Sequence, residues 1–272
     1  MQIIELTDTC FPGAEAYFHL TDAQMRSRQE PEKGIFIAEG PKVVGTALDN
    51  GYQPISILMR RKFLETVQGR DLIQRAGDVP VFTADDDLLA EITGFKLQRS
   101  WILSAMRRRQ SCLSDEIIVK AKCVAVLEGI TEPSNLGAIF RSAAAMGIDG
   151  ILISPNCCDP YHRRAVRVCM GSLFSVPWAR TEDDLSIPML KQLGFTCIGL
   201  TLQPDSIPLY DEKLANLERT ALFLGTEDTG LSAGTIDKLD MSAIIPMRPG
   251  IDSLNVAAAA AIAFWEFAGK HR

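Results

Sequence analysis

Five polar residues in the C-terminal half have types and spacings that could do chemistry: Asn135, Arg141, Glu227, Ser253 and Asn255. Asn135 directly precedes a predicted Ala-rich helix, and Arg141 lies on that helix, about 9 Å further along its axis at 1.5 Å per residue. A guanidinium is a poor base at neutral pH, but the forked donors of Arg141 could hold an anion through paired hydrogen bonds. The structural alternatives are a helix N-cap for Asn135 and an exposed or ion-paired helix residue for Arg141.

The other three candidates, Glu227, Ser253 and Asn255, lie in or beside loops that contain glycine. Glu227 lies between Gly225 and Gly230, which let the backbone pass close to a ligand or to another segment. Its carboxylate could alternatively accept hydrogen bonds from nearby loop amides. Ser253 and Asn255 stand just before a strongly helix-forming segment, so they could orient hydroxyl groups or cap that helix.

Basic residues gather in clusters although the 272-residue chain has a formal net charge of -6. Because net charge offers no long-range attraction to a polyanion, phosphate binding would need local cations within roughly 8 Å, the Debye length at physiological salt. The candidate phosphate contacts form two clusters: Arg163, Arg164 and Arg167, and Arg60, Arg61 and Lys62. A third cluster, Arg107–Arg109, lies in a predicted linker. Each cluster could equally be a solvated face.

Composition and motif searches exclude several classes of protein. The 47% hydrophobic and 23% charged residues are typical of a globular domain. No apolar run is long enough to span a membrane, and Glu5 and Asp8 stand where a signal peptide would be basic, so we expect a cytoplasmic protein. The seven cysteines include no Cys-x-x-Cys pair, which favours reduced thiols and no metal. Glycine motifs for dinucleotides, phosphates and nucleophilic serine are missing.

The elements that must position these residues alternate between strand and helix. The N-terminal half predicts strands at 34–38, 55–59, 79–82 and 97–104 and helices at 42–48, 61–74 and 85–91. The C-terminal half predicts strands at 124–127, 150–153, 195–200, 221–224 and 243–246, and helices at 136–146 and 256–268. Short apolar strands without alternation indicate a parallel sheet covered by helices on both faces. We therefore predict an α/β fold with domains at 1–105 and 119–272 and a linker at 106–118.

Three segments together resemble the motifs of the SpoU (TrmH) family of RNA ribose 2′-O-methyltransferases, within the SPOUT superfamily. They are Glu132–Ala143, Leu224–Ser232 and Ile245–Val256. Their order, separations and positions after predicted strands all match, over essentially all of residues 120–270. The N-terminal part is similar to the substrate-binding extension often found in this family, a small α/β domain like a ribosomal RNA-binding protein. Phe36–Gly40 is its most recognisable piece.

The resemblance implies an enzyme that transfers a methyl group from S-adenosylmethionine to a ribose 2′-hydroxyl in ribosomal or transfer RNA. Arg141 would contact that hydroxyl, and we favour a clamp over a general base for it. The resemblance also implies a deep trefoil knot and a homodimer in which helix 256–268 packs against its partner and both subunits complete each site. The residues implied to bind S-adenosylmethionine are Gly225, Ile245, Leu254, Thr201 and Met247.

Two departures from the family pattern and two other functions stay open at this point. Ala257 stands where a serine is common, and Pro249 adds a rigid residue to the third motif. The same fold could serve a catalytically idle RNA-binding or ribosome-assembly protein. A small-molecule α/β enzyme with a substrate-capping domain is the other alternative.

Overall fold

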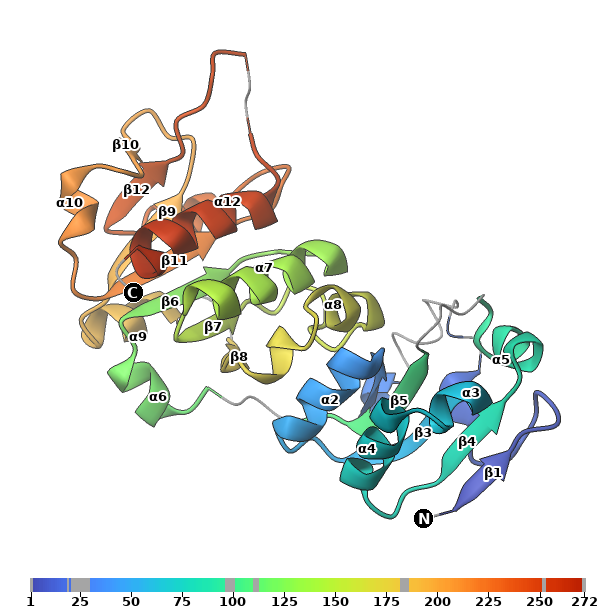
Figure 1. Cartoon of the computed structure of the whole chain (residues 1–272). Coiled ribbons are helices and arrows are strands. Elements are labelled where there is room, and N and C mark those ends of the chain that lie inside the picture. The colour runs from blue at the N-terminus through green and yellow to red at the C-terminus, as the bar shows by residue number, and fades with distance from the viewer. Residues whose placement is uncertain are drawn as a thin grey trace. The chain divides into compact units, whose positions relative to one another are not determined.

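The chain forms two compact units (Figure 1). The computed structural model describes residues 2–18, 20, 30–95, 101–109, 113–181, 186–250 and 253–270. The first unit comprises Met1–Arg109 and Tyr161–Phe174, and the second comprises Gln110–Pro160 and Ser175–Arg272. The first boundary, at Arg109, falls inside the predicted linker. Tyr161–Phe174 differs from the prediction, which assigned this segment to the C-terminal domain.

The first unit is built on a mixed sheet of five strands in the order β1-β4-β3-β5-β2. β5 is antiparallel to both of its neighbours, and β1, β4 and β3 are mutually parallel. The strands are β1 (Ile3–Glu5), β2 (Ile35–Glu39), β3 (Pro54–Arg60), β4 (Val81–Ala84) and β5 (Ile102–Arg107). The helices are α2 (Pro41–Asp49), α3 (Arg61–Leu64), α4 (Val67–Ala76), α5 (Asp86–Thr93) and α8 (Arg163–Val168), with 3-10 turns at Glu15–Tyr17 and Ser172–Phe174.

The predicted helix over 61–74 is two helices. It divides because the hydroxyl of Thr66 accepts a hydrogen bond from the Gly69 amide at 3.0 Å and so caps a new helix. The sequence prediction omitted β1, whose three residues are too few to show a pattern. The predicted strand over 97–104 begins outside the described residues, and its visible part is β5.

Aromatic side chains explain why Tyr161–Phe174 belongs to the first unit. The Tyr161 hydroxyl lies 3.1 Å from that of Tyr52, and the ring centroids of Phe36 and Tyr161 are 4.8 Å apart. The Phe174 ring lies 4.7 Å from that of Tyr52. All four side chains are buried. A segment that follows β7 in the sequence therefore completes the core under β2 and α2.

The second unit contains a seven-stranded sheet in the order β10-β12-β9-β11-β6-β7-β8, and each pairing within it is parallel over the described residues. The strands are β6 (Cys123–Leu127), β7 (Gly150–Ile153), β8 (Trp178–Arg180), β9 (Thr196–Leu200), β10 (Ile207–Pro208), β11 (Thr220–Leu224) and β12 (Met241–Ile244). The helices are α6 (Asp115–Lys120), α7 (Pro133–Met146), α9 (Ser186–Gln192), α10 (Glu212–Ala215), α11 (Ala233–Ile236) and α12 (Val256–Phe264). The predicted parallel α/β architecture is confirmed.

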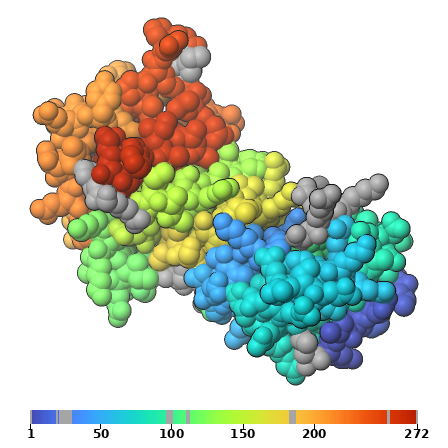
Figure 2. Space-filling view, viewed as in Figure 1, coloured from blue at the N-terminus to red at the C-terminus, as the bar shows by residue number. Residues whose placement is uncertain are grey.

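Helices cover both faces of this sheet. Ile118 of α6, Leu190 of α9 and Ile236 of α11 pack on one face together with Val126 and Phe223. α7 and α12 lie side by side on the other face, where Figure 2 shows their residues on one continuous surface. Among the described helices, none has the length and apolar character needed to cross a membrane.

Two predicted helix boundaries are wrong. α7 begins at Pro133, because the Glu132 side chain accepts the Ser134 amide and Pro133 fits the first helical turn. Asn135 therefore lies inside α7 instead of capping it. The terminal helix ends as an α-helix at Phe264 and continues as a π-helical turn over Trp265–Gly269.

Candidate active site

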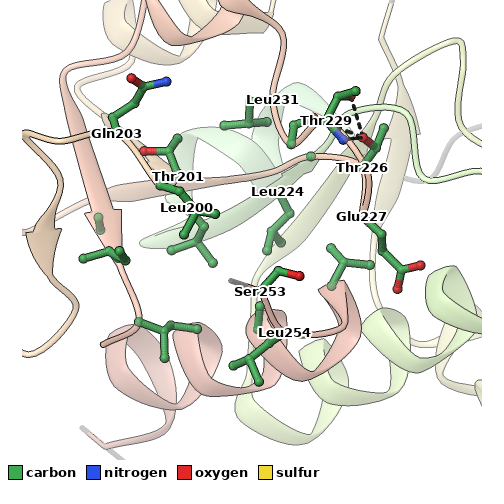
Figure 3. A pocket seen from close by; sticks show the side chains of 18 of the residues that line it. Leu200, Thr201, Gln203, Leu224, Thr226, Glu227, Thr229, Leu231, Ser253 and Leu254 are labelled. Atoms are coloured by element: carbon green, nitrogen blue, oxygen red, sulfur yellow. Dashed lines mark hydrogen bonds between the residues drawn. The ribbon is translucent and has the colours of Figure 1, made fainter. Parts of the chain in front are cut away.

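A cavity of about 400 Å³ opens where β9, β11 and β12 end (Figure 3). Leu200, Leu224 and Ile244, the last residues of those strands, contribute to its walls. Parallel sheets commonly bind ligands outside the carboxyl ends of their strands, and this volume suits a small molecule. The five residues predicted to bind S-adenosylmethionine all line this cavity: Gly225, Ile245, Leu254, Thr201 and Met247.

Gly225 is required by a tight turn beside the cavity, in which residues five positions apart come into contact. A Cβ at this position would lie 2.1 Å from the carbonyl carbon of Gly230. The loop between them closes on itself, because Thr226 and Gly230 exchange backbone hydrogen bonds of 3.0 and 3.1 Å. The Thr226 hydroxyl also accepts the Thr229 amide at 3.0 Å. The loop is therefore held from within, and it carries Glu227 at the cavity wall.

Three of the predicted catalytic residues form one hydrogen-bonded network. The Asn135 amide donates to Glu227 Oε1 at 2.8 Å, and the Asn255 amide donates to the same oxygen and to Asn135 Oδ1, the latter at 3.0 Å. Asn255 Oδ1 also accepts the Ala257 amide at 3.0 Å and caps α12. The network joins the first turn of α7, the loop after β11 and the start of α12. Glu227 and Asn255 are exposed, so a substrate can reach them.

The other two predicted catalytic residues are not part of this network. Ser253 is exposed and lines the cavity. Arg141 is exposed on α7, and its guanidinium has no hydrogen-bond or ion-pair partner within the described ranges. Six residues of α-helix turn through 600°, so Arg141 points away from the direction of Asn135 by roughly 120°. Arg141 is thus available to a molecule outside this chain.

The basic candidates in α8 differ in their availability. Arg163 is largely buried, with its guanidinium 4.8 Å from the centroid of the Phe95 ring and 3.8 Å from a Glu39 oxygen, and burial lowers its pKa. Arg167 lies 3.6 Å from Glu39, but its side chain is 58% exposed. Arg164 is exposed. Arg164 and Arg167 therefore remain the accessible cations, whereas Arg163 has a structural role in the first unit.

The cluster that begins at Arg60 divides in the same way. Arg60 is 17% exposed and pairs with Asp86 at 2.7 Å, and Arg61 pairs with Glu5. Lys62 is exposed and has no ion pair among the described residues.

None of the cysteines that the structure describes lines the cavity. Burial raises the pKa of Cys123 and of Cys158 to about 12 and that of Cys197 to about 11, so these groups stay protonated at neutral pH. The described cysteines are free, and Cys112 lies outside the described residues. In the ranges that the structure describes, no three His, Cys, Asp or Glu side chains converge to hold a metal.

The sequence analysis missed several residues of the cavity. Thr226, Gln203 and Leu231 also line it, and the Thr201 hydroxyl lies 2.9 Å from that of Ser206. In the sequence, the only local signal for these residues was the pair of glycines, Gly225 and Gly230, on either side of the turn that contains Thr226. The apolar walls and scattered hydroxyls suit an adenosyl group, which is bound mainly by apolar contact and backbone groups.

Comparisons with known proteins identify the family of this chain. Residues 122–265 match the model of the SpoU rRNA Methylase family. An uncharacterized tRNA/rRNA methyltransferase of Mycobacterium bovis is 35% identical over 97% of this chain and 92% of its own length. The 23S rRNA (guanosine(2553)-2′-O)-methyltransferase RlmP of Bacillus subtilis is 29% identical over 58% of this chain and 62% of its own length.

A solved structure extends the likeness to the whole chain. The AdoMet-bound rRNA methyltransferase from Sinorhizobium meliloti has a TM-score of 0.83 and 25% identity, and the match covers 100% of this chain and 99% of that one. The range that matches the family model contains the cavity and the Asn135–Glu227–Asn255 network. S-adenosylmethionine is the cofactor expected for a cavity of this family. The chain belongs to the SpoU family of RNA methylases.

Proposed function

We propose that the protein transfers a methyl group from S-adenosylmethionine to the 2′-hydroxyl of a ribose in structured ribosomal or transfer RNA. The observation that carries the proposal is the network of the half-buried Asn135 with the exposed Glu227 and Asn255, beside a cavity of cofactor size. The Bacillus subtilis relative and an Escherichia coli relative, 32% identical over 52% of this chain, are both named for guanosine 2′-O-methylation of 23S rRNA. Those names support the ribose hydroxyl as acceptor.

The cofactor, when bound, supplies an electrophilic methyl group. The chain must therefore bring an RNA hydroxyl into line with that group and accept its proton elsewhere. The network fixes the Glu227 loop against α7 and α12, so that the edge of the cavity keeps one shape while RNA approaches. Arg141 clamps an RNA phosphate and the 2′-hydroxyl through its forked donors, and the proton leaves to phosphate or water.

A homodimer is part of the proposal, because Arg141 is separate from the network of its own chain. The exposed side of α12 and of the π-helical turn carries Ala258, Ile262 and Trp265, at spacings of four and three residues on one face. Ile262 is 42% exposed and Trp265 is 51% exposed. Burial of this face against a second copy would let Arg141 of one subunit act at the site of the other.

The remaining elements of the proposal concern the first unit, the topology and the location. Arg164, Arg167 and Lys62 would bind RNA phosphates on the first unit. The deep trefoil knot that the family resemblance implies and a cytoplasmic location are also part of the proposal.

The test is incubation of purified protein with labelled S-adenosylmethionine and unmodified transcripts of ribosomal and transfer RNA. We expect label in 2′-O-methylated nucleosides. Arg141→Ala should lower transfer by more than tenfold, because loss of a transition-state contact exceeds about 1.4 kcal/mol. Its S-adenosylmethionine affinity should stay within twofold of wild type. Arg164→Ala, another exposed arginine, is the matched control and should affect RNA affinity more than the rate at saturating RNA.

Two outcomes would contradict this proposal. Transfer by Arg141→Ala above about a tenth of the wild-type rate would remove the assigned role of Arg141. A protein that binds S-adenosylmethionine and RNA but transfers no methyl group would instead be a catalytically idle RNA-binding protein.

A further inference from the structure

A second cavity, of about 250 Å³, lies in the second unit and shares no lining residue with the first. Its apolar walls include Val126, Phe223 and Pro155. Its polar lining includes Glu128, directly after β6, and Asn156, three residues after β7. Nothing in the proposed chemistry of the first cavity uses these residues.

The two cavities are close neighbours. Gly129 follows Glu128, and a Cβ on Gly129 would lie 2.8 Å from Thr226 Cγ2 and 3.4 Å from Asn156 Nδ2. Thr226 lines the first cavity and Asn156 lines the second. The Glu128 carboxylate also accepts the Ser232 amide at 3.3 Å, which ties β6 to the segment after the Glu227 loop. The two cavities therefore meet at Gly129, but the second lies on the face of the sheet that α9 and α11 cover, whereas the network lies with α7 and α12. A nucleotide whose ribose lies at the network would have to pass its base across the sheet edge beside Gly129 to enter the second cavity.

The wall of the second cavity is rigidly held. Arg180 Nη1 donates to the carbonyl oxygens of Ser154 and Cys157, both at 3.3 Å, and Nη2 donates to that of Cys158 at 3.0 Å. The Ser154 hydroxyl accepts the Gly129 amide at 3.1 Å. A loop held by this many bonds has the fixed shape that recognition of a flat ring requires.

The polar groups of the cavity present a defined hydrogen-bonding pattern. Glu128 Oε1 accepts no hydrogen bond from the described residues, and Oε2, which has two lone pairs, accepts only one. Asn156 Oδ1 accepts the Ser154 hydroxyl, and the Asn156 amide nitrogen donates no hydrogen bond within the described residues, so its two N–H groups remain donors for a ligand. A ligand that fits must therefore offer adjacent N–H groups to a carboxylate and an acceptor to an amide.

Among the four RNA bases, guanine alone carries two adjacent donors, N1–H and the N2 amino group, next to an acceptor, O6. Uracil offers one N–H between two acceptors, and adenine and cytosine each offer one amino group beside a ring acceptor. Enzymes that modify nucleotides commonly read an unstacked base through its Watson–Crick edge. We propose that the second cavity binds the base of the target nucleotide and selects guanine, with Glu128 accepting from N1–H and N2 and with Asn156 donating to O6. This inference rests on the function proposed above.

The first experiment identifies the product of the wild-type protein. Unmodified transcripts of 23S ribosomal RNA and transfer RNA are methylated with labelled S-adenosylmethionine and digested to nucleosides. We expect the label in 2′-O-methylguanosine. Label in any other 2′-O-methylnucleoside would overturn guanine selection and leave the proposed function intact. Absence of transfer to every RNA would overturn the proposed function together with this inference.

The second experiment tests Glu128 itself. Glu128→Gln should lower kcat/KM for the RNA by at least tenfold and leave S-adenosylmethionine affinity unchanged. Glu116→Gln, at an exposed carboxylate on α6, is the matched control and should behave as wild type. Inosine lacks the N2 amino group of guanosine. When inosine replaces the mapped guanosine, kcat/KM of the wild-type protein should fall by at least tenfold, and that of Glu128→Gln by no more than about twofold.

If inosine lowers kcat/KM by the same factor in the wild type and in Glu128→Gln, the assignment of Glu128 is overturned. Equal factors mean that the two changes act independently, so the carboxylate does not contact N2. If Glu128→Gln fails to fold, Asn156→Ala supplies the test. Asn156→Ala should lower kcat/KM at least fivefold for RNA that carries guanosine at the target position. The decrease should be the same for inosine, because inosine retains O6. An unchanged rate would remove Asn156 from the site.

Discussion

Replacement of Gly225 by alanine tests whether the wall of the cavity depends on the tight turn between Gly225 and Gly230. The new Cβ would lie 2.1 Å from the Gly230 carbonyl carbon and 2.3 Å from the Leu231 nitrogen. Carbon atoms in contact prefer about 3.5–4.0 Å. Because both neighbours are backbone atoms, no side-chain rotation can relieve the clash. One segment must move by roughly 1.5 Å.

The energetic cost follows from what that movement breaks. The loop from Thr226 to Gly230 is closed by two backbone hydrogen bonds, which contribute about 0.5–1.5 kcal/mol each. Overpacking of a buried position adds about 1–3 kcal/mol. We therefore expect Gly225→Ala to lower the free energy of unfolding by about 3 kcal/mol. The same displacement moves Glu227 away from Asn135, so S-adenosylmethionine affinity should fall by at least tenfold.

Urea denaturation and calorimetric titration with S-adenosylmethionine measure the two effects. Gly234→Ala is the matched control, because a Cβ at that position in α11 meets nothing within 4 Å. That variant should unfold like wild type or gain about 0.4–1 kcal/mol. If Gly225→Ala matched Gly234→Ala in both measurements, the turn would not be the support of the cavity that its geometry indicates.

Three further predictions concern thiol ionisation, RNA binding and assembly. Burial raises the pKa of Cys123 to about 12, whereas a thiol in an unfolded chain has a pKa of about 8.5. The stability that the protonated Cys123 thiol contributes should therefore be complete below pH ~8.5 and decline as the pH rises toward 12. Urea midpoints measured from pH 7 to 10.5 should therefore converge with those of Cys123→Ala, and parallel curves would contradict the buried thiol. Replacing Arg164 and Arg167 together by alanine should reduce the dependence of RNA affinity on salt. The slope of log affinity against log salt concentration should become shallower by about 1.4–1.8, at about 0.7–0.9 per phosphate contact. An unchanged slope would mean that these cations are a solvated face. Ile262→Asp or Trp265→Asp should convert a dimer to a monomer in sedimentation velocity, and a monomeric wild type would refute the proposed dimer.

Five strands of the second unit were predictable because they report their environment locally, whereas β8 and β10, of three and two residues, were not predicted. The residues of β6 and β11 are buried without exception, and an uninterrupted apolar run is the signature of a strand covered on both faces. The start of α7 was not predictable in the same way. Both Glu132 and Asn135 could cap a helix, and the choice depended on Pro133 fitting the first turn.

The network of the active site lies beyond any local pattern. Asn135 is 92 residues from Glu227 and 120 residues from Asn255 in the sequence. Only the resemblance to a family placed these residues in one site, and it did not show that Asn255 both caps α12 and bonds the other two. The burial of Arg163 was hidden for the same reason, because its partner Glu39 belongs to a strand 124 positions earlier.

The segment Tyr161–Phe174 limits how this protein could be cut, shortened or recombined. A fragment that stops at Arg109 would leave the Phe36 and Tyr52 rings without the aromatic side chains that cover them. The first unit is therefore not a module that a simple gene fusion could attach or remove. Any exchange of this unit between relatives would have to carry a piece from the middle of the methyltransferase sequence with it, so the two parts of the protein must change together.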